Sequence, residues 1–298
     1  MNKLGTVDHV NSGNDDLNLS SPQIVKHDLK TGETEIITNN LQQNIVTSDI
    51  QTEIVELPSK GLLYPSDHPL HKGVIEIKYM TAKEEDILST QSYIKQGIVL
   101  DKLCESIIAT KGVKFNDLII GDKNAVLFAA RAYGYGPTYQ TVVKSNDGTE
   151  IPIAINLEEL PYTEIDESLI TPGVNKFTYT LPRSQKTIEF KLLTVGDQKK
   201  IDDAIKNMKK MGPNYPVQNL TMRLKYMILS VDGNTDKGVI NTFIDNMLAV
   251  DSRAFREYVA KIQPDVNLEV EVEDPNTGEP FRSSFEIGVD LFYPDYKK

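Results

Sequence analysis

The chain has 298 residues, enough for one large domain or two domains of ordinary size. Its 43 acidic and 32 basic residues give a net charge of −11, which argues against a duplex-DNA coat or a polybasic membrane binder, because both depend on positive charge. The only cysteine, Cys104, excludes an intrachain disulfide and a cysteine-built zinc site, and no apolar run approaches the roughly 18 residues of a membrane-spanning helix.

The N-terminal region is polar. Met1 to Leu4 lack the apolar core of a signal peptide, so we expect a soluble cytoplasmic protein. Residues 1–45 contain no aromatic side chain and bury too little apolar surface to offset the entropy of ordering, which predicts a disordered or weakly ordered polar tail. Within it, Ile24-Val25 and Ile36-Ile37 flank a turn and predict one marginal β-hairpin.

A regular order of elements begins near residue 52. Residues 53–57 are predicted to form a strand that ends at Leu57-Pro58, and the alternation from Val74 to Tyr79 predicts its partner. Thr81 and Glu84 have the spacing of a capping box, which begins a helix.

The first half continues with helices and a hairpin. Apolar residues over 100–108 follow the spacing of one helix face, and Asp122 is predicted to cap the next helix, whose apolar stripe runs over 125–133. Alternating residues over 139–144 and 151–157 flank Asn146-Asp147-Gly148 and predict a β-hairpin.

The second half repeats this order. A strand over 177–181 ends at Leu181-Pro182, and a partner strand follows over 188–192. Thr194 stands where the first capping residue stood, and Asp251 is predicted to cap a helix as Asp122 does. Alternating residues over 266–272 and 285–291 predict the second hairpin.

The predicted fold class is therefore α+β, built as an internal duplication of one module of strand, turn, strand, helices and β-hairpin. The first module is expected over 46–165. The second is expected over 170–298, with an extra helix near 236–249 indicated by apolar residues at helical spacing.

Candidate catalytic motifs each have a simpler structural explanation. The pair His68 and His71 lies among prolines and glycine, which favours a solvated loop over a metal site. The acids after Thr81 suit the first turn of a helix, where their negative charge interacts favourably with the positive end of the helix macrodipole. We therefore assign no catalytic, cofactor-binding or metal-binding residue, expect no cofactor, and do not expect an enzyme.

Two apolar segments are candidate partner contacts. One segment lies in the loop at 62–65, and the other follows the last predicted strand. Each is expected either to pack into the core or to bind a partner protein. The candidate interface residues are Leu62, Leu63, Tyr64, Pro65, Phe292, Tyr293 and Pro294.

Several motifs, taken in order, are similar to those of one known family. They are Leu57-Pro58-Ser59-Lys60-Gly61 with Tyr64-Pro65, Met80 to Leu88, Ile94 to Gly97, Leu100 to Leu103, Gly121 to Ala125 with Arg131 and Gly134-Tyr135-Gly136, Ser230 to Gly233, Asp251 to Arg253, and Phe292 to Asp295. Together they resemble the baseplate hub assembly proteins of T-even-type contractile-tailed bacteriophages, over roughly residues 53–295.

The resemblance implies a role in building the central hub of a phage tail baseplate, as a hub component or an assembly chaperone. It implies other hub proteins as partners, no catalytic residue, no membrane, and a place in the host cytoplasm during assembly or in the virion baseplate. Some relatives carry cysteine pairs near the hairpin tips that suggest zinc, but this chain has Ser145 to Gly148 and Asp274 to Gly278 there. A zinc site is therefore not expected.

Two other functions stay open on the sequence. A carboxylate-based hydrolase associated with the tail would need two acids that converge in a cleft. A nucleic-acid-binding module would use the lysines near 199–210, although the acidic balance of the chain favours a solvated face or a protein contact there.

Overall fold

The computed structural model divides the chain into two compact units, Met1–Asp49 and Ile50–Lys298. The structure describes residues 24–27, 34–37, 51–145, 147–163, 165–212, 216, 218–274, 278–285 and 287–292. In the first unit, strand β1 (Ile24–His27) pairs antiparallel with β2 (Thr34–Ile37), which confirms the predicted hairpin. The remainder of the predicted tail lies outside the described residues.

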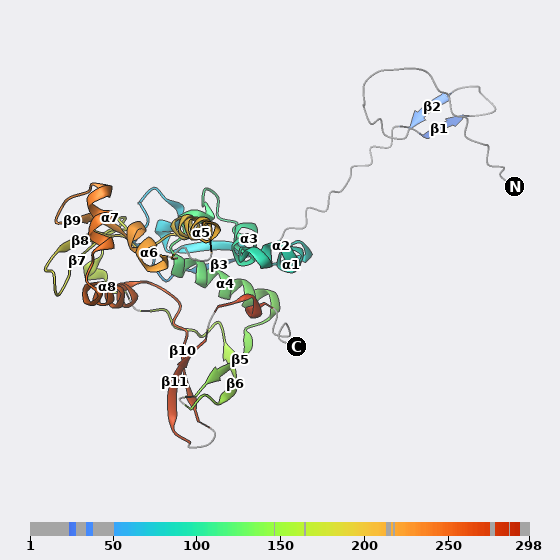
Figure 1. The fold of residues 1–298 in the computed structure, drawn as a ribbon. Helices are drawn as coiled ribbons and strands as arrows, with labels where there is room; N and C mark the ends of the chain where they lie inside the picture. The colour runs from blue at the N-terminus through green and yellow to red at the C-terminus, as the bar shows by residue number, and fades with distance from the viewer. Residues whose placement is uncertain are drawn as a thin grey trace. The chain divides into compact units, whose positions relative to one another are not determined.

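The second unit mixes helices with small antiparallel sheets, as the α+β prediction required (Figure 1). Its first half comprises β3 (Thr52–Glu56), a 3-10 turn (Pro69–Lys72), β4 (Val74–Lys78), α1 (Ala82–Ser89), α2 (Gln91–Gln96), α3 (Val99–Ile107), a second 3-10 turn (Phe115–Asp117), α4 (Ile120–Tyr135), β5 (Thr138–Lys144) and β6 (Glu150–Asn156).

The second half comprises a 3-10 turn (Glu167–Leu169), β7 (Phe177–Thr180), β8 (Thr187–Phe190), α5 (Val195–Lys210), α6 (Asn219–Met227), β9 (Ile228–Val231), α7 (Lys237–Asp245), α8 (Ala249–Ile262), β10 (Glu269–Glu273), β11 (Pro280–Ser284) and a last 3-10 turn (Val289–Leu291). Strands β7, β8 and β9 form one sheet, while β3 pairs with β4, β5 with β6 and β10 with β11. Apart from residues 46–49, which belong to the first unit, both predicted modules fall within this second unit, which is not divided further.

The two predicted capping boxes are confirmed. The Glu84 side chain accepts from the Thr81 backbone N–H at 3.0 Å, and its buried carboxylate also forms an ion pair with Lys78 at 3.0 Å. In the second half the Asp197 carboxylate accepts from the Thr194 N–H at 3.2 Å and pairs with Lys191 at 2.6 Å. In both places a lysine, the last residue of β4 or the residue after β8, neutralises the acid in the first turn of the next helix.

The predicted caps at Asp122 and Asp251 are wrong, because each aspartate is the third residue of its helix. The buried Asp122 carboxylate instead accepts from the Ser59 N–H and the Tyr64 hydroxyl, at 2.9 and 2.5 Å. Asp251 accepts from the N–H groups of Arg183 and Ser184, at 2.7 and 3.0 Å. Each aspartate therefore binds the turn that follows a Leu-Pro pair, more than sixty residues earlier in the chain.

The two halves share one core. Gly121 at the start of α4 lies so close to the second half that a Cβ there would stand 1.9 Å from the Pro264 carbonyl oxygen. Nearby, the Asn124 amide donates to Asp265 at 2.9 Å. At the other end of α4, the buried Arg131 guanidinium donates to the Leu291 carbonyl at 2.7 Å.

The hairpins β5–β6 and β10–β11 lie side by side, away from the helices (Figure 1). Phe285, which follows β11, packs its ring 6.2 Å from that of Tyr139 on β5 and also 6.2 Å from that of Phe128 on helix α4. The predicted strand over 285–291 is wrong: β11 begins directly after the turn, where Pro280 pairs with Glu273, and ends at Ser284. The side chains of Phe285 and Leu291 are instead buried in the core.

Candidate functional site

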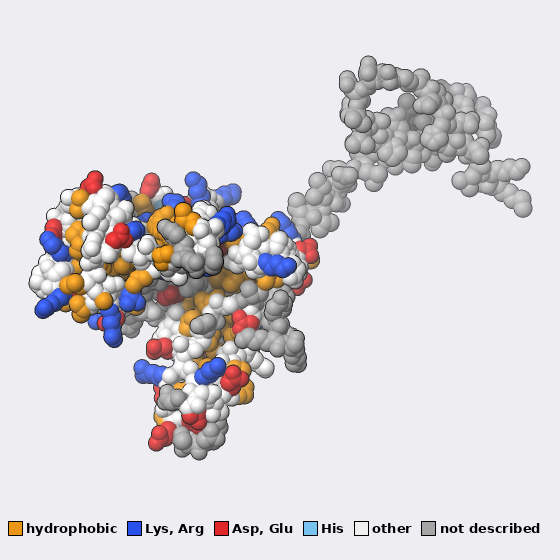
Figure 2. All heavy atoms as spheres, viewed as in Figure 1, with side chains coloured by type: hydrophobic (Ala, Val, Ile, Leu, Met, Phe, Trp, Pro, Cys, Tyr) orange, Lys and Arg blue, Asp and Glu red, His pale blue; other side chains and the backbone are white. Residues whose placement is uncertain are grey.

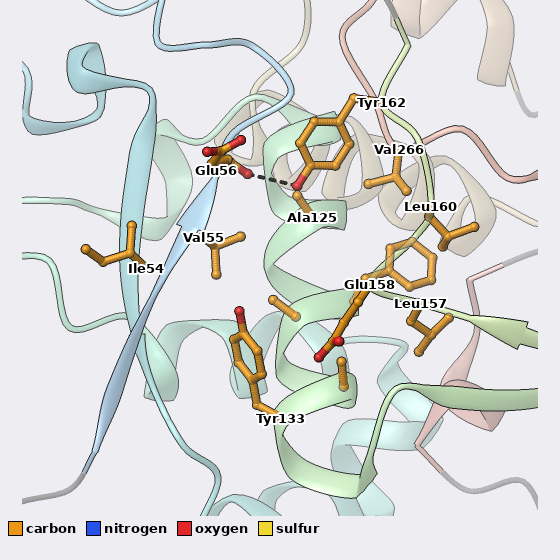
Figure 3. Close-up of a pocket in the computed structure, with 13 residues that line it drawn as sticks. Ile54, Val55, Glu56, Ala125, Tyr133, Leu157, Glu158, Leu160, Tyr162 and Val266 are labelled. Carbon is orange, nitrogen blue, oxygen red and sulfur yellow. Dashed lines mark hydrogen bonds between the residues drawn. The ribbon is translucent and has the colours of Figure 1, made fainter.

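A cavity of about 340 Å³ lies over helix α4, between strand β3 and the segment that follows β6. Figure 3 shows Ile54 and Val55 on one side, Leu157, Leu160 and Tyr162 on the other, and α4 between them. Its volume falls at the low end of the range for binding pockets. We call this cavity the β3 groove; its lining residues are Ile54, Val55, Glu56, Ala125, Phe128, Ala129, Ala132, Tyr133, Leu157, Glu158, Leu160, Tyr162 and Val266.

Small side chains on α4 leave the groove open. Ala125, Ala129 and Ala132 line it at the spacing of one helix face. Ala129 follows the buried Asp122 by seven residues, and Tyr258 on α8 follows the buried Asp251 by the same number. There the larger side chain fills the space, because the Tyr258 ring stacks on Tyr179 of strand β7 at 4.4 Å.

Among the strands that the structure describes, β3 pairs only with β4, which leaves its other side as an edge. The Leu57 N–H donates to the Gly73 carbonyl, and the Tyr79 N–H donates to the Gln51 carbonyl. In an antiparallel pair the backbone N–H and C=O groups of alternate residues point toward the partner strand. The backbone groups of Glu53 and Val55 therefore hydrogen-bond to β4, and those of Ile54 point away from it.

The outward-facing groups of β3 lie along the groove. The Glu56 carbonyl, which also faces outward, accepts from the Tyr162 hydroxyl at 3.0 Å (Figure 3). Within the part of the chain that the structure describes, the backbone groups of Ile54 have no hydrogen-bond partner, and its side chain is 67% exposed. The groove thus runs along the kind of strand edge that accepts a further strand.

The groove is acidic at its rim. Glu56 and Glu158 line it and form no ion pair with any described residue. Burial, followed by the charges of Glu53 and Glu158, raises the pKa of Tyr133. Burial and then the charge of Glu56 raise the pKa of Tyr162. The tyrosines therefore remain neutral donors at pH 7, beside carboxylates that attract a cation.

The predicted interface residues lie elsewhere. Leu63 and Tyr64 are buried in the core, Leu62 is half-buried and Pro65 is exposed. Phe292 is also buried, and its ring lies edge-on to Tyr135 at 6.4 Å. Tyr293 and Pro294 lie outside the described residues.

Of the two alternatives for the apolar segments, the structure favours core closure. Leu63, Tyr64 and Phe292 are no more than 3% exposed, so these side chains are not available to a partner. Their burial has a role in the fold, because the Tyr64 hydroxyl also accepts from the Ile119 N–H at 2.9 Å next to helix α4. The β3 groove has no signal of its own in the sequence, because the apolar stripe over 125–133 suits any buried helix face and the 53–57 strand has a predicted partner.

The carboxylate with a raised pKa lies outside the groove. Burial raises the pKa of Asp122 to about 6, although the hydrogen bonds from Tyr64 and Ser59 oppose this effect. Asp122 is fully buried and does not line the groove, so it lacks the access to substrate that a general acid needs. Among the described residues, no three His, Cys, Asp or Glu side chains converge as a metal site requires.

The lysines of α5 are mixed with acids. A cavity of about 570 Å³ between α3 and α5 is lined by Lys102, Lys199, Lys206 and Lys209 and by Asp101, Asp202 and Asp203. Lys199 also pairs with Glu105 at 2.8 Å. Blue and red side chains are likewise interspersed on the visible face of the molecule (Figure 2). This mixture lacks the continuous positive surface that binds a nucleic-acid backbone.

Every described helix is too short or too polar to span a bilayer. Comparisons of the chain with family models, with curated proteins and with solved structures found no match.

Proposed function

We propose that this chain is a phage tail baseplate hub protein that acts in assembly through protein–protein contacts, as a hub component or as a chaperone. The β3 groove carries the proposal, because an unpaired strand edge beside an apolar floor is suited to an extended polypeptide segment. The motifs that resemble the hub assembly family support it, and they include the Leu57 to Gly61 turn that binds Asp122.

We also propose that the second unit arose by duplication of one α+β module. Matching hydrogen bonds support this. Lys78 and Glu84 correspond to Lys191 and Asp197, each 113 residues later (191 − 78 = 197 − 84), and both pairs form the same ion pair beside a capping box. The buried aspartates bind the turn after Leu-Pro in both halves.

A strand contact repeats between the halves as well. Ile77 bridges Ile108 in the first half, and Phe190 pairs with Ile228 in the second, in each case between a strand and the residue that follows a helix. Superposition of residues 53–160 on residues 177–292 in an experimental structure tests the duplication, and elements that do not superpose in the same order would refute it.

The test of the assembly role is a tagged pull-down from infected cells, with the bound proteins identified and quantified. We expect stoichiometric recovery of other baseplate hub proteins. Presence of this chain in purified virions would identify it as a hub component. Its absence from virions, despite recovery of hub proteins with it from infected cells, would identify it as a chaperone. Recovery of the chain alone from infected cells would overturn the proposed function.

A further inference from the structure

We infer that the β3 groove binds an extended segment of a hub partner, which adds to strand β3 as a further β-strand and places a lysine or arginine at the acidic rim. The inference rests on the proposed function and specifies the ligand of its groove. Three features of the groove support it: its backbone groups, its floor and its charge.

The backbone of β3 provides the pairing groups. Ile54 directs its N–H and C=O away from β4 and toward the groove, and no described residue occupies them. Tyr162 already binds the Glu56 carbonyl and so closes that end of the edge. An incoming strand therefore pairs along Thr52 to Ile54, where backbone hydrogen bonds supply affinity without demanding a particular side chain.

The floor selects the side chains that face α4. An added strand directs alternate residues toward the helix, where Ala125 and Ala129 leave room for an apolar side chain. The corresponding position on α8 lacks that room, because the Tyr258 ring stacks on Tyr179 of strand β7 at 4.4 Å. The difference between alanine and tyrosine thus makes the first half the one that receives the segment.

The rim determines the charge of the segment. Glu56 and Glu158 line the groove without an ion pair, and Glu53 lies close enough to raise the pKa of Tyr133. A second copy of this acidic chain would meet charge repulsion, whereas a segment with a lysine or arginine would neutralise the rim and approach faster at low salt.

The first experiment is photo-cross-linking in infected cells, with p-benzoylphenylalanine in place of the exposed Ile54. Mass spectrometry identifies the linked peptide. We expect a segment of a hub protein with alternating apolar residues and at least one lysine or arginine. Cross-links only to a second copy of the chain, only to residues of the same chain, or to nothing would each overturn the inference.

The second experiment uses a synthetic peptide of the cross-linked segment and the full-length chain, with binding measured by fluorescence anisotropy. Ile54→Pro removes the outward N–H without breaking a β3–β4 hydrogen bond, so we expect affinity to fall by about tenfold or more. Ile54→Ala keeps that N–H and is the matched control, with a smaller expected loss. Equal affinity for wild type and Ile54→Pro would overturn strand addition.

Two further variants test the floor and the rim. Ala129→Tyr places in α4 the side chain that α8 carries at Tyr258, and we expect it to abolish binding while the far-UV circular dichroism stays unchanged. Joint replacement Glu56→Gln and Glu158→Gln is expected to weaken binding and to reduce its dependence on salt. If neither replacement changes the affinity, the groove is not the binding site.

The outcomes separate the inference from the proposed function. If wild type recovers hub proteins and Ile54→Pro and Ala129→Tyr recover them equally well, the hub role stands and the groove inference is overturned. If wild type recovers no hub protein, the proposed function itself fails.

Discussion

The buried Asp122 gives a prediction for the dependence of stability on pH. Burial raises its pKa from an ordinary value of 3.8 to about 6. The folded chain therefore holds this proton more tightly than the unfolded chain, and the contribution of Asp122 favours folding most at low pH. The free energy of unfolding that this group contributes falls as the pH rises from about 4 through 6, and it is constant above that.

The magnitude follows from the shift of about two pKa units. Each unit corresponds to about 1.4 kcal/mol, so ionisation of Asp122 costs the fold on the order of 3 kcal/mol between pH 4 and 7. Asp122→Asn cannot ionise and is free of this cost. The unfolding free energy of wild type minus that of Asp122→Asn should therefore fall by about 3 kcal/mol over this range.

Urea unfolding followed by circular dichroism at four pH values between 4 and 7 measures this difference. Other carboxylates titrate equally in both proteins and cancel. Asp251→Asn is the matched control: burial opposes ionisation of Asp251, but the N–H groups of Arg183 and Ser184 outweigh it and lower the pKa. Because its pKa lies below 3.8 in the folded chain, Asp251 is ionised in both states over this range, and its difference from wild type should stay nearly constant between pH 4 and 7. A difference for Asp122→Asn that stays constant with pH would contradict the raised pKa of Asp122.

Three further predictions concern positions away from the groove. Gly121→Ala places a Cβ 1.9 Å from the Pro264 carbonyl and should lower the unfolding free energy in urea by about 3 kcal/mol or more. Gly97→Ala, whose Cβ meets no atom within 4 Å, should lower it by about 1 kcal/mol; equal losses would contradict the close approach at Gly121. Burial raises the pKa of Cys104 to about 12, so its reaction with a thiol reagent at pH 8 should follow the opening of the fold, and immediate labelling of native protein would disprove its burial. Burial opposes ionisation of Glu84, but its hydrogen bonds lower the pKa to about 2. Glu84→Gln should therefore reduce the unfolding free energy by about 2 kcal/mol at pH 7, and by progressively less as the pH falls from 4.5 toward 2. A loss independent of pH would contradict the ion pair.

Local features of the fold were predictable from the sequence. The capping boxes at Thr81 and Thr194 depend on residues three positions apart, and the structure confirms both. The extra helix predicted near 236–249 is observed as α7, and Asp236 caps it by accepting from the Val239 N–H at 2.9 Å. Such features depend on neighbours in the chain, so periodicity and side-chain chemistry are sufficient to predict them.

Features that depend on distant partners were not predictable. Asp122 has the residue type of a cap, but its carboxylate binds Ser59 and Tyr64, which stand 63 and 58 residues away in the chain. The same applies to the β3 groove. An alanine at 129 suits a buried helix face, and only the position of β3 beside that face shows that the space above it is open. A single sequence does not specify such pairings.

The contact between Arg131 and Leu291 also bears on the order in which the chain folds. The two residues are 160 positions apart, and the guanidinium also donates to the Gly136 and Thr138 carbonyls at the base of the first hairpin. When only the first half has been synthesised, the Arg131 guanidinium on α4 lacks one of its three acceptors, the Leu291 carbonyl. Contacts of such sequence separation slow folding. We therefore expect the first half to reach its final packing only after the polypeptide has been synthesised through Leu291.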